Sequence, residues 1–312
     1  MAASEGQPGA PPHLLDLVAG RTVRAVWLDR EGAGATADYW ESLWAEEKAD
    51  PPPQLLRAIE RHLPQGGRVL ESGCGQGEYV RLLERPGRTV VGADQAHRAL
   101  ARAHRDTPTL LLATADVSRL PFPDGAFDAI LSLGVVEHFE AGPSVPLSEQ
   151  RRLLAPEGRL ILTVPQRSWL RAGTDLWHLG IRRQGQYREG RRRTITHLPR
   201  PAPSTGPGAF HQYELSRRQL RRYLESAGFA IERWEGFDVG TALSKARSGR
   251  RTEAPASPTP SRPGTVAGPR GARARLRRVL LTDDPVGPVG RAGRSLARRT
   301  LGHLHLVVAR PA

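Results

Sequence analysis

The 312-residue chain contains a single cysteine, Cys74, and only two lysines, Lys48 and Lys245. One cysteine cannot form an internal disulfide, and no group of His and Cys residues has the spacing of metal ligands, so no metal site is expected. No apolar run reaches the roughly 18 residues that a membrane-spanning helix needs, and the N-terminal residues lack the features of a signal peptide. These absences predict a cytoplasmic protein.

Charge is distributed unevenly along the chain. Residues 1–165 carry 17 basic and 22 acidic side chains, a net charge of −5, whereas residues 166–312 carry 29 basic and 10 acidic side chains, a net charge of +19. Such an excess fits an anionic substrate, a membrane surface or nucleic acid. The alternative is a solvated surface whose arginines reflect a GC-rich genome, because nearly all basic residues are arginines and Gly and Pro are abundant.

Short apolar segments alternate with helical patterns between Arg68 and Val164. Five strands with intervening helices of this length predict a parallel sheet that is covered on both faces. Farther along, Ser216 is a suitable N-cap for a helix that ends near Gly228, and strands are expected at residues 229–234 and 303–309. The predicted fold class is therefore α/β, a Rossmann-like, mostly parallel sheet.

Composition gives the expected organisation around this sheet. A flexible N-terminus precedes one α/β domain with a cofactor half and a lid or substrate insertion, and a low-complexity, Arg-rich insertion with two short helical stretches precedes the closing strand. In chain order, these parts are residues 1–35, the domain at 36–239 with its cofactor half at 66–165 and its insertion at 166–210, the low-complexity part at 240–302 with helical stretches near 274–281 and 291–301, and the closing strand at 303–312.

The strongest motif is the glycine-rich turn from Gly73 to Gly77, which follows the strand that ends at Glu71. Glycines permit positive φ and allow a ligand to approach the backbone, so free amides are expected to face a pyrophosphate or the carboxylate of an amino acid. The dinucleotide fingerprint requires a later glycine where this chain has Glu78, whose carboxylate would repel a pyrophosphate. The turn therefore favours S-adenosylmethionine (SAM) over a nicotinamide dinucleotide.

Two aspartates follow later strands of the predicted sheet. Asp94 ends the second strand, where a carboxylate can accept hydrogen bonds from both hydroxyls of a ribose, although a helix-capping role is the alternative. Asp116 ends the third strand, where it can accept from the exocyclic amine of adenine while the next amide, that of Val117, donates to the ring. Together they predict a nucleoside ligand.

The ordered set of motifs resembles the class I SAM-dependent methyltransferases, in particular the small-molecule, ubiquinone-biosynthesis-like "type 11" branch. The matching segments are residues 71–77, Asp94, residues 115–116, 120–128, 136–138 and 153–160, and the match continues from Tyr213 to Phe229. The resemblance implies a seven-stranded sheet with an antiparallel last strand and SAM as the cofactor. The residues expected to bind it are Glu71, Gly73, Cys74, Gly75, Gly77, Asp94, Gln95, Asp116, Val117 and Leu133.

Two histidines are the candidate catalytic residues. His138 follows the fourth strand, and its ordinary pKa near 6.5 suits a general base, although a structural role is the alternative. The resemblance implies that His211 faces the substrate. The aromatic residues Tyr39, Trp40 and Trp44 either cover the cofactor or pack an N-terminal helix.

The resemblance leaves the methyl acceptor open. A small molecule is expected, methylated on oxygen, nitrogen or carbon, with an anionic or lipid-like acceptor and at most peripheral membrane contact. An RNA methyltransferase that uses the basic C-terminal half and a non-catalytic SAM-binding protein are the alternatives. The sequence does not indicate the oligomeric state.

Overall fold

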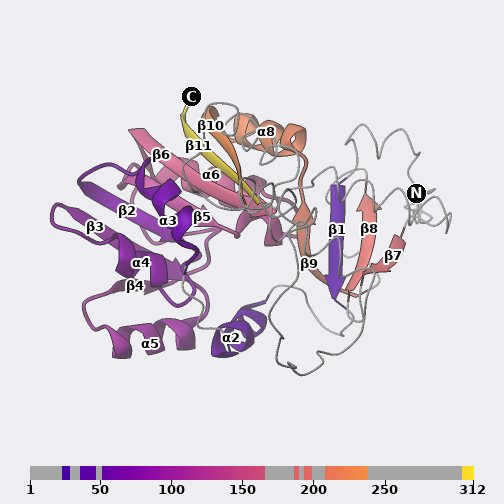
Figure 1. The fold of residues 1–312 in the computed structure, drawn as a ribbon, viewed down its shortest axis with the longest axis horizontal. Helices are drawn as coiled ribbons and strands as arrows, with labels where there is room; N and C mark the ends of the chain where they lie inside the picture. The colour runs from indigo at the N-terminus through magenta and orange to yellow at the C-terminus, as the bar shows by residue number, and fades with distance from the viewer. Residues whose placement is uncertain are drawn as a thin grey trace, which may run out of the picture.

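The computed structural model describes residues 23–28, 36–46, 51–165, 186–189, 193–198, 208–237 and 304–312. Its main feature is a seven-stranded sheet with the strand order β10-β11-β6-β5-β2-β3-β4 (Figure 1). Strands β2 to β6 run parallel to one another, whereas β11 pairs antiparallel with both β6 and β10. The strands are β2 (Gly67–Ser72), β3 (Arg88–Asp94), β4 (Leu111–Thr114), β5 (Phe127–Leu133), β6 (Leu154–Pro165), β10 (Phe229–Phe237) and β11 (Leu304–Pro311). The predicted fold class is confirmed.

Helices cover both faces of this sheet because successive strand residues point to opposite sides. Val69 and Ile161 belong to one buried cluster, which also contains residues of the helices α3 (Pro53–Glu60), α4 (Glu78–Leu83) and α5 (His97–Asp106). Their neighbours Leu70 and Leu162 belong to a second cluster, which contains residues of α6 (Ser144–Leu153) and α8 (Arg217–Ser226). The sheet is thus the middle layer of three.

A second, antiparallel sheet has the strand order β7-β8-β1-β9 (Figure 1, right). Its strands are β1 (Val23–Leu28), β7 (Gln186–Glu189), β8 (Arg193–Leu198) and β9 (Ala209–Glu214). Its residues Trp27 and Tyr213 belong to the same buried cluster as Leu70 of the large sheet. Arg24 and Glu214 form a buried ion pair of 2.7 Å between β1 and β9.

The expectation of a flexible segment over residues 1–35 was wrong for Val23–Leu28. The Gly, Ala and Pro around this segment concealed a short strand, whose residues Val23, Ala25 and Trp27 alternate toward the buried cluster. The predicted low-complexity segment and its two helical stretches lie outside the described residues. Among the described helices, none combines the length and the apolar character needed to cross a bilayer.

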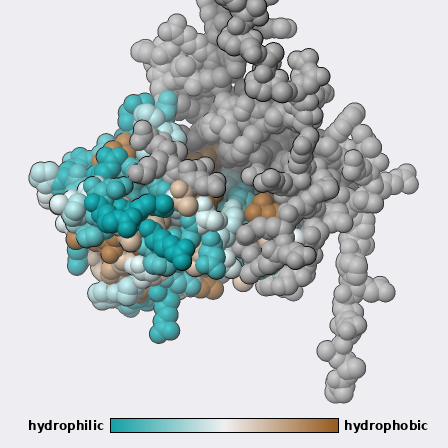
Figure 2. Space-filling view, turned by 90° about the horizontal axis from the view of Figure 1, so that it is seen from below, coloured by the Kyte–Doolittle hydropathy of each residue, from teal (hydrophilic) through white to brown (hydrophobic). Residues whose placement is uncertain are grey.

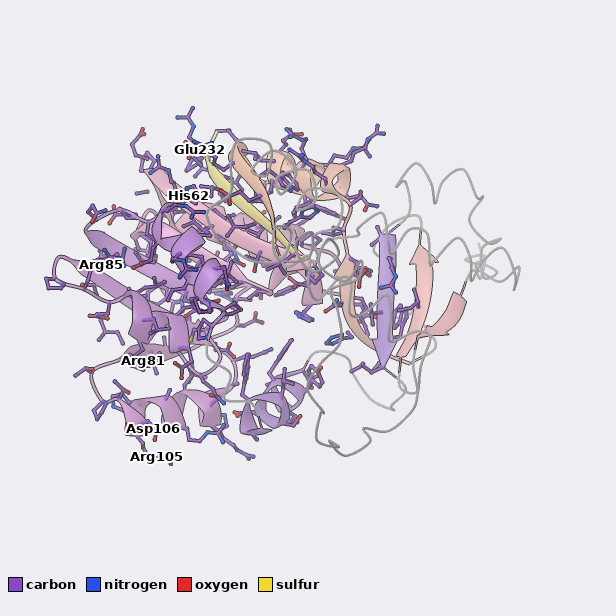
Figure 3. All side chains as sticks on the ribbon, in the orientation of Figure 1. His62, Arg81, Arg85, Arg105, Asp106 and Glu232 are labelled. Atoms are coloured by element: carbon purple, nitrogen blue, oxygen red, sulfur yellow. The ribbon has the colours of Figure 1, made fainter. Side chains whose placement is uncertain are left out.

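Charged side chains are concentrated on the outside of the large-sheet half. Figure 2 shows a mostly hydrophilic described surface with small, separated apolar areas. Among the labelled side chains in Figure 3, Arg85 lies at the left edge of this half, and Arg105 and Asp106 lie at its lower edge. The described large apolar side chains that are exposed, Leu82, Leu111 and Val145, lie on different elements.

The expected N-cap of α8 is present and gives a direct test of local stability. The Gln219 amide donates to Ser216 Oγ at 3.3 Å, and the Ser216 amide donates to Gln219 Oε1 at 2.9 Å, which completes a capping box. We predict that Ser216→Ala lowers the free energy of unfolding by about 1 kcal/mol in urea titrations. Ser226→Ala, at the exposed end of the same helix, is the control and should have a smaller effect. Equal losses in the two variants would contradict the capping role.

Candidate functional site

A cavity of about 730 Å³ lies at the carboxyl ends of β2, β3 and β5. Open α/β sheets bind ligands at this edge because the strands stop there and the following loops diverge. Helix α2 (Ala37–Glu46) and Phe210 of β9 contribute the opposite walls. The cavity is therefore bounded by the large sheet, α2 and the second sheet. Figure 1 shows how these three parts are arranged.

The cavity contains most of the predicted cofactor residues. The lining residues among them are Glu71, Gly73, Cys74, Asp94, Gln95, Asp116, Val117 and Leu133. Gly75 and Gly77 are not among the described lining residues. These two glycines contribute to the conformation of the turn. The Gly75 amide contacts Asp94, and Gly77 precedes the first residue of α4.

The expectation of free amides in the glycine-rich turn was wrong for Gly73, Cys74, Gly75 and Gly77. The amides of Gly73 and Cys74 both donate to the carbonyl of Ala93, at 2.8 and 3.1 Å. The Gly75 amide donates to Asp94 Oδ2 at 2.8 Å, and the Gly77 amide donates to the Cys74 carbonyl. Buried backbone donors are almost always paired, and here the end of β3 supplies the partners of three of these four amides. The turn is therefore held by the protein before any ligand binds.

Two of the glycines are required by close packing as well as by backbone conformation. Gly73 has a φ of +84°, and a Cβ there would lie 2.5 Å from Val135. Gly75 has a φ of +53°, and a Cβ there would lie 2.7 Å from the Trp44 ring. Any other residue would be strained at these φ values and would displace a cavity wall. The turn is thus fitted to α2 on one side and to the end of β5 on the other.

Asp94 holds two segments of the site at once. Its Oδ2 accepts from the Gly75 amide, and its Oδ1 accepts from the Ala96 amide at 2.9 Å. Burial raises the pKa of Asp94, and the hydrogen bonds from Ala96 and Gly75 oppose that shift. Each carboxylate oxygen retains a second lone pair, so an Asp94 that lines the cavity can still accept from a ligand hydroxyl.

Glu71 is a buried carboxyl group at the base of the cavity. Its Oε2 accepts from the Val80 amide in the first turn of α4, at 3.2 Å. Burial raises the pKa of Glu71 well above its usual range, and the nearby Asp94 raises it further. A cationic group in the cavity would have the opposite effect, because an adjacent positive charge stabilises the ionised carboxylate.

The described lining is acidic. It contains five carboxyl groups and, in the part that the structure describes, neither lysine nor arginine; the five are Glu71, Glu78, Asp94, Asp116 and Glu140. Glu78 is partly neutralised by Arg81, whose guanidinium lies 2.6 Å away. This electrostatic environment favours a cationic ligand and disfavours a pyrophosphate.

The two candidate histidines lie together at the other end of the cavity. Their ring centroids are 5.1 Å apart, but only His138 is among the described lining residues. His138 Nδ1 lies 2.6 Å from the His211 carbonyl. A carbonyl can only accept, so Nδ1 carries the proton and Nε2 of the neutral ring has a lone pair. Burial lowers the pKa of His138 to about 4, so the ring is neutral at physiological pH.

The structure also adds residues that the sequence reasoning missed. Phe139, Glu140 and Phe210 line the cavity, and each lies within two residues of one of the candidate histidines in the sequence. Their closeness to the candidate histidines in the sequence was the signal that could have identified these lining residues. Trp40 and Trp44 also line it, as the lid interpretation of the aromatic cluster requires, whereas Tyr39 is not among the described lining residues.

Comparisons with known proteins relate the segment that contains most of these lining residues to a known domain type. Residues 70–162 match a protein-family model described as "Methyltransferase domain". A protein from Mycolicibacterium smegmatis, named as a probable SAM-dependent methyltransferase, is 27% identical over 184 residues, which cover 59% of this chain and 60% of the relative. A demethylmenaquinone methyltransferase from Thermus thermophilus is 41% identical over 113 residues, which cover 34% of this chain and 51% of the relative.

The chain thus spans about half to three-fifths of the length of these two curated relatives. Among solved structures, a chain in a complex that contains a methyltransferase activator from Haloferax volcanii aligns with a TM-score of 0.50 and 18% identity. The alignment covers 88% of this chain and 95% of that one. At this level of identity the likeness concerns the fold alone.

Glu137, next to His138, allows a test of how completely the buried region beside the cavity excludes water. Its side chain is only 2% exposed, and burial raises its pKa from the ordinary 4.5 to about 8. The folded protein therefore keeps this carboxyl protonated in a range where the unfolded chain ionises. Its contribution to stability is complete below pH 4.5 and is lost as the pH rises to about 8.

We predict that Glu137→Gln, which mimics the protonated group, gains stability relative to the wild type as the pH rises through this range. The gain should be at most about 1.4 kcal/mol for each pH unit in urea titrations. Glu157→Gln, at an exposed position of β6, is the matched control for the substitution. A difference between wild type and Glu137→Gln that stays constant from pH 4.5 to 8 would contradict the prediction.

Proposed function

We propose that this chain, whose residues 70–162 form a class I SAM-dependent methyltransferase domain of the type 11 branch, transfers a methyl group from SAM to a small-molecule acceptor. The observation that carries the proposal is the acidic cavity at the carboxyl ends of β2, β3 and β5. SAM has a sulfonium and an ammonium group, and such cations are stabilised by buried carboxylates.

The lining residues fit SAM in three regions of the cavity. Asp94 would accept hydrogen bonds from the ribose hydroxyls, and Asp116 with the Val117 amide would recognise adenine. Asp116 Oδ1 already accepts from the Ser118 amide at 2.8 Å, which fixes the direction of its carboxylate. The buried Glu71 would pair with the ammonium group of the methionine part of SAM. This role replaces the expectation that free amides of the turn bind the methionine carboxylate.

When bound, SAM supplies an activated methyl group on a good leaving group. The protein's contribution is then to orient the acceptor and to exclude water, and orientation of this kind lowers a barrier by roughly 7–11 kcal/mol. Trp40, Phe139 and Phe210 provide apolar walls near His138. His138 Nε2 would accept a proton or a hydrogen bond from a hydroxyl or amine of the acceptor.

The acceptor in this proposal is a small, largely apolar molecule. The demethylmenaquinone methyltransferase from Thermus thermophilus supports an aromatic acceptor of the quinone type by its name. The acidic and aromatic lining supports a neutral acceptor and argues against the anionic acceptor that was considered from the sequence. A cytoplasmic location stays a prediction from the sequence.

Two alternatives have distinct consequences. An RNA methyltransferase would bind RNA with an affinity that falls steeply with salt. A non-catalytic SAM-binding protein would bind SAM without turnover. Calorimetry with SAM, combined with transfer of a labelled methyl group to neutral quinols and to RNA, distinguishes these functions.

The ribose assignment gives a specific prediction. We expect Asp94→Ala to weaken SAM binding at least tenfold in calorimetry, because charge-assisted hydrogen bonds are worth roughly 1.5–3 kcal/mol each. Asp128→Ala is the matched control, since Asp128 also accepts from a backbone amide, that of Arg68 at 2.8 Å, but lies at the opposite end of the sheet. Unchanged affinity in Asp94→Ala would refute the assignment. Binding of a nicotinamide dinucleotide in place of SAM would refute the function.

A further inference from the structure

Helix α2 contacts both ends of the cavity. Trp44, near the end of the helix, lies against Gly75 of the glycine-rich turn. The Trp44 carbonyl accepts hydrogen bonds from Gln76 Nε2 at 2.5 Å and from Arg102 at 2.8 Å. Glu41 Oε1 accepts from the Arg98 amide at 2.8 Å in the first turn of α5. One end of α2 is therefore fixed to the elements that surround the proposed cofactor.

The other end of α2 contacts the two histidines. The ring of Trp40 packs edge-on against His138, with centroids 4.7 Å apart. The Tyr39 hydroxyl lies 3.3 Å from Nδ1 of His211, and the two rings also pack edge-on. These contacts join α2 to the proposed acceptor end of the same cavity.

A β-bulge explains why the His211 carbonyl is available to His138. In the pairing of β1 with β9, Val26 opposes Gln212 and Trp27 opposes Phe210, so the register skips His211. A bulged residue leaves the regular ladder, and its backbone and side chain turn in new directions. The carbonyl of His211 accepts from His138 Nδ1, while the imidazole of His211 contacts Tyr39. His211 thus connects α2 to the orientation of the His138 ring.

We infer that Tyr39 is a positioning residue, which holds the bulged His211 so that His138 presents Nε2 to the cavity, and that α2 thereby couples the cofactor end to the acceptor end. The inference rests on the proposed function for the names of these two ends. Because Tyr39 is not among the described lining residues, its effect on a ligand passes through α2 and His211. Fixing Trp44 at the cofactor end also favours the arrangement in which Tyr39 reaches His211.

The test uses Tyr39→Phe in the full chain, with Tyr223→Phe as the matched control. Tyr223 lies on α8, packs against the large buried cluster and is not part of the cavity lining. In the wild type, imidazole ¹⁵N spectra should show His138 with a proton on Nδ1 and none on Nε2. We expect Tyr39→Phe to convert this signal into a mixture of tautomers, and Tyr223→Phe to leave it unchanged.

Calorimetry gives the second readout. We expect Tyr39→Phe to weaken SAM binding roughly three- to tenfold, because one hydrogen bond is lost. In a Trp44→Ala background, where the other end of the helix is already loosened, the same substitution should have little further effect. Wild-type values for both the His138 spectrum and SAM affinity in Tyr39→Phe would overturn the inference, as would equal changes in Tyr223→Phe. If the wild type itself did not bind SAM, the proposed function would fail, and the His138 spectrum alone would still decide whether Tyr39 positions that ring.

Discussion

The site depends on the carboxylate of Asp94, which holds the turn after β2 and the start of α5 in one arrangement. One oxygen accepts from Gly75 and the other from Ala96, so the two loops that diverge at this edge of the sheet are fixed relative to each other. This arrangement brings Glu71 and Asp116 to the same cavity. Two of the cavity's carboxyl groups, those of Glu71 and Asp94, are buried at a cost in free energy, and a cationic ligand would offset part of that cost.

The sequence predicted the large sheet well because its signals are local. The alternation of strands and helices, the glycine-rich turn and the capping residues of α8 each depend on a few neighbouring residues, and the comparisons confirm the class I, type 11 family resemblance. The second sheet was missed for the opposite reason. Strand β1 pairs with β8 and β9, which lie more than 160 residues later, and its own six residues carry little periodic signal.

The candidate site divides in the same way. Residues at strand ends, such as Asp94 and Leu133, could be placed from the sequence because the carboxyl ends of parallel strands meet at one edge. The partners of the Gly73, Cys74 and Gly75 amides could not, since they belong to the neighbouring strand β3. The relation between His138 and His211 depends on a bulge whose position only the pairing of β1 and β9 determines.

The position of β11 has a consequence for biosynthesis. This strand is the last in the chain, yet it lies inside the sheet, between β6 and β10. While the ribosome is still translating residues before 304, β6 and β10 have no partner on the sides that β11 will occupy, so the central layer closes only when residues 304–311 have emerged. Nascent chains of this protein therefore expose two strand edges until residues 304–311 have emerged, a stage at which a chaperone would protect them from pairing with other chains.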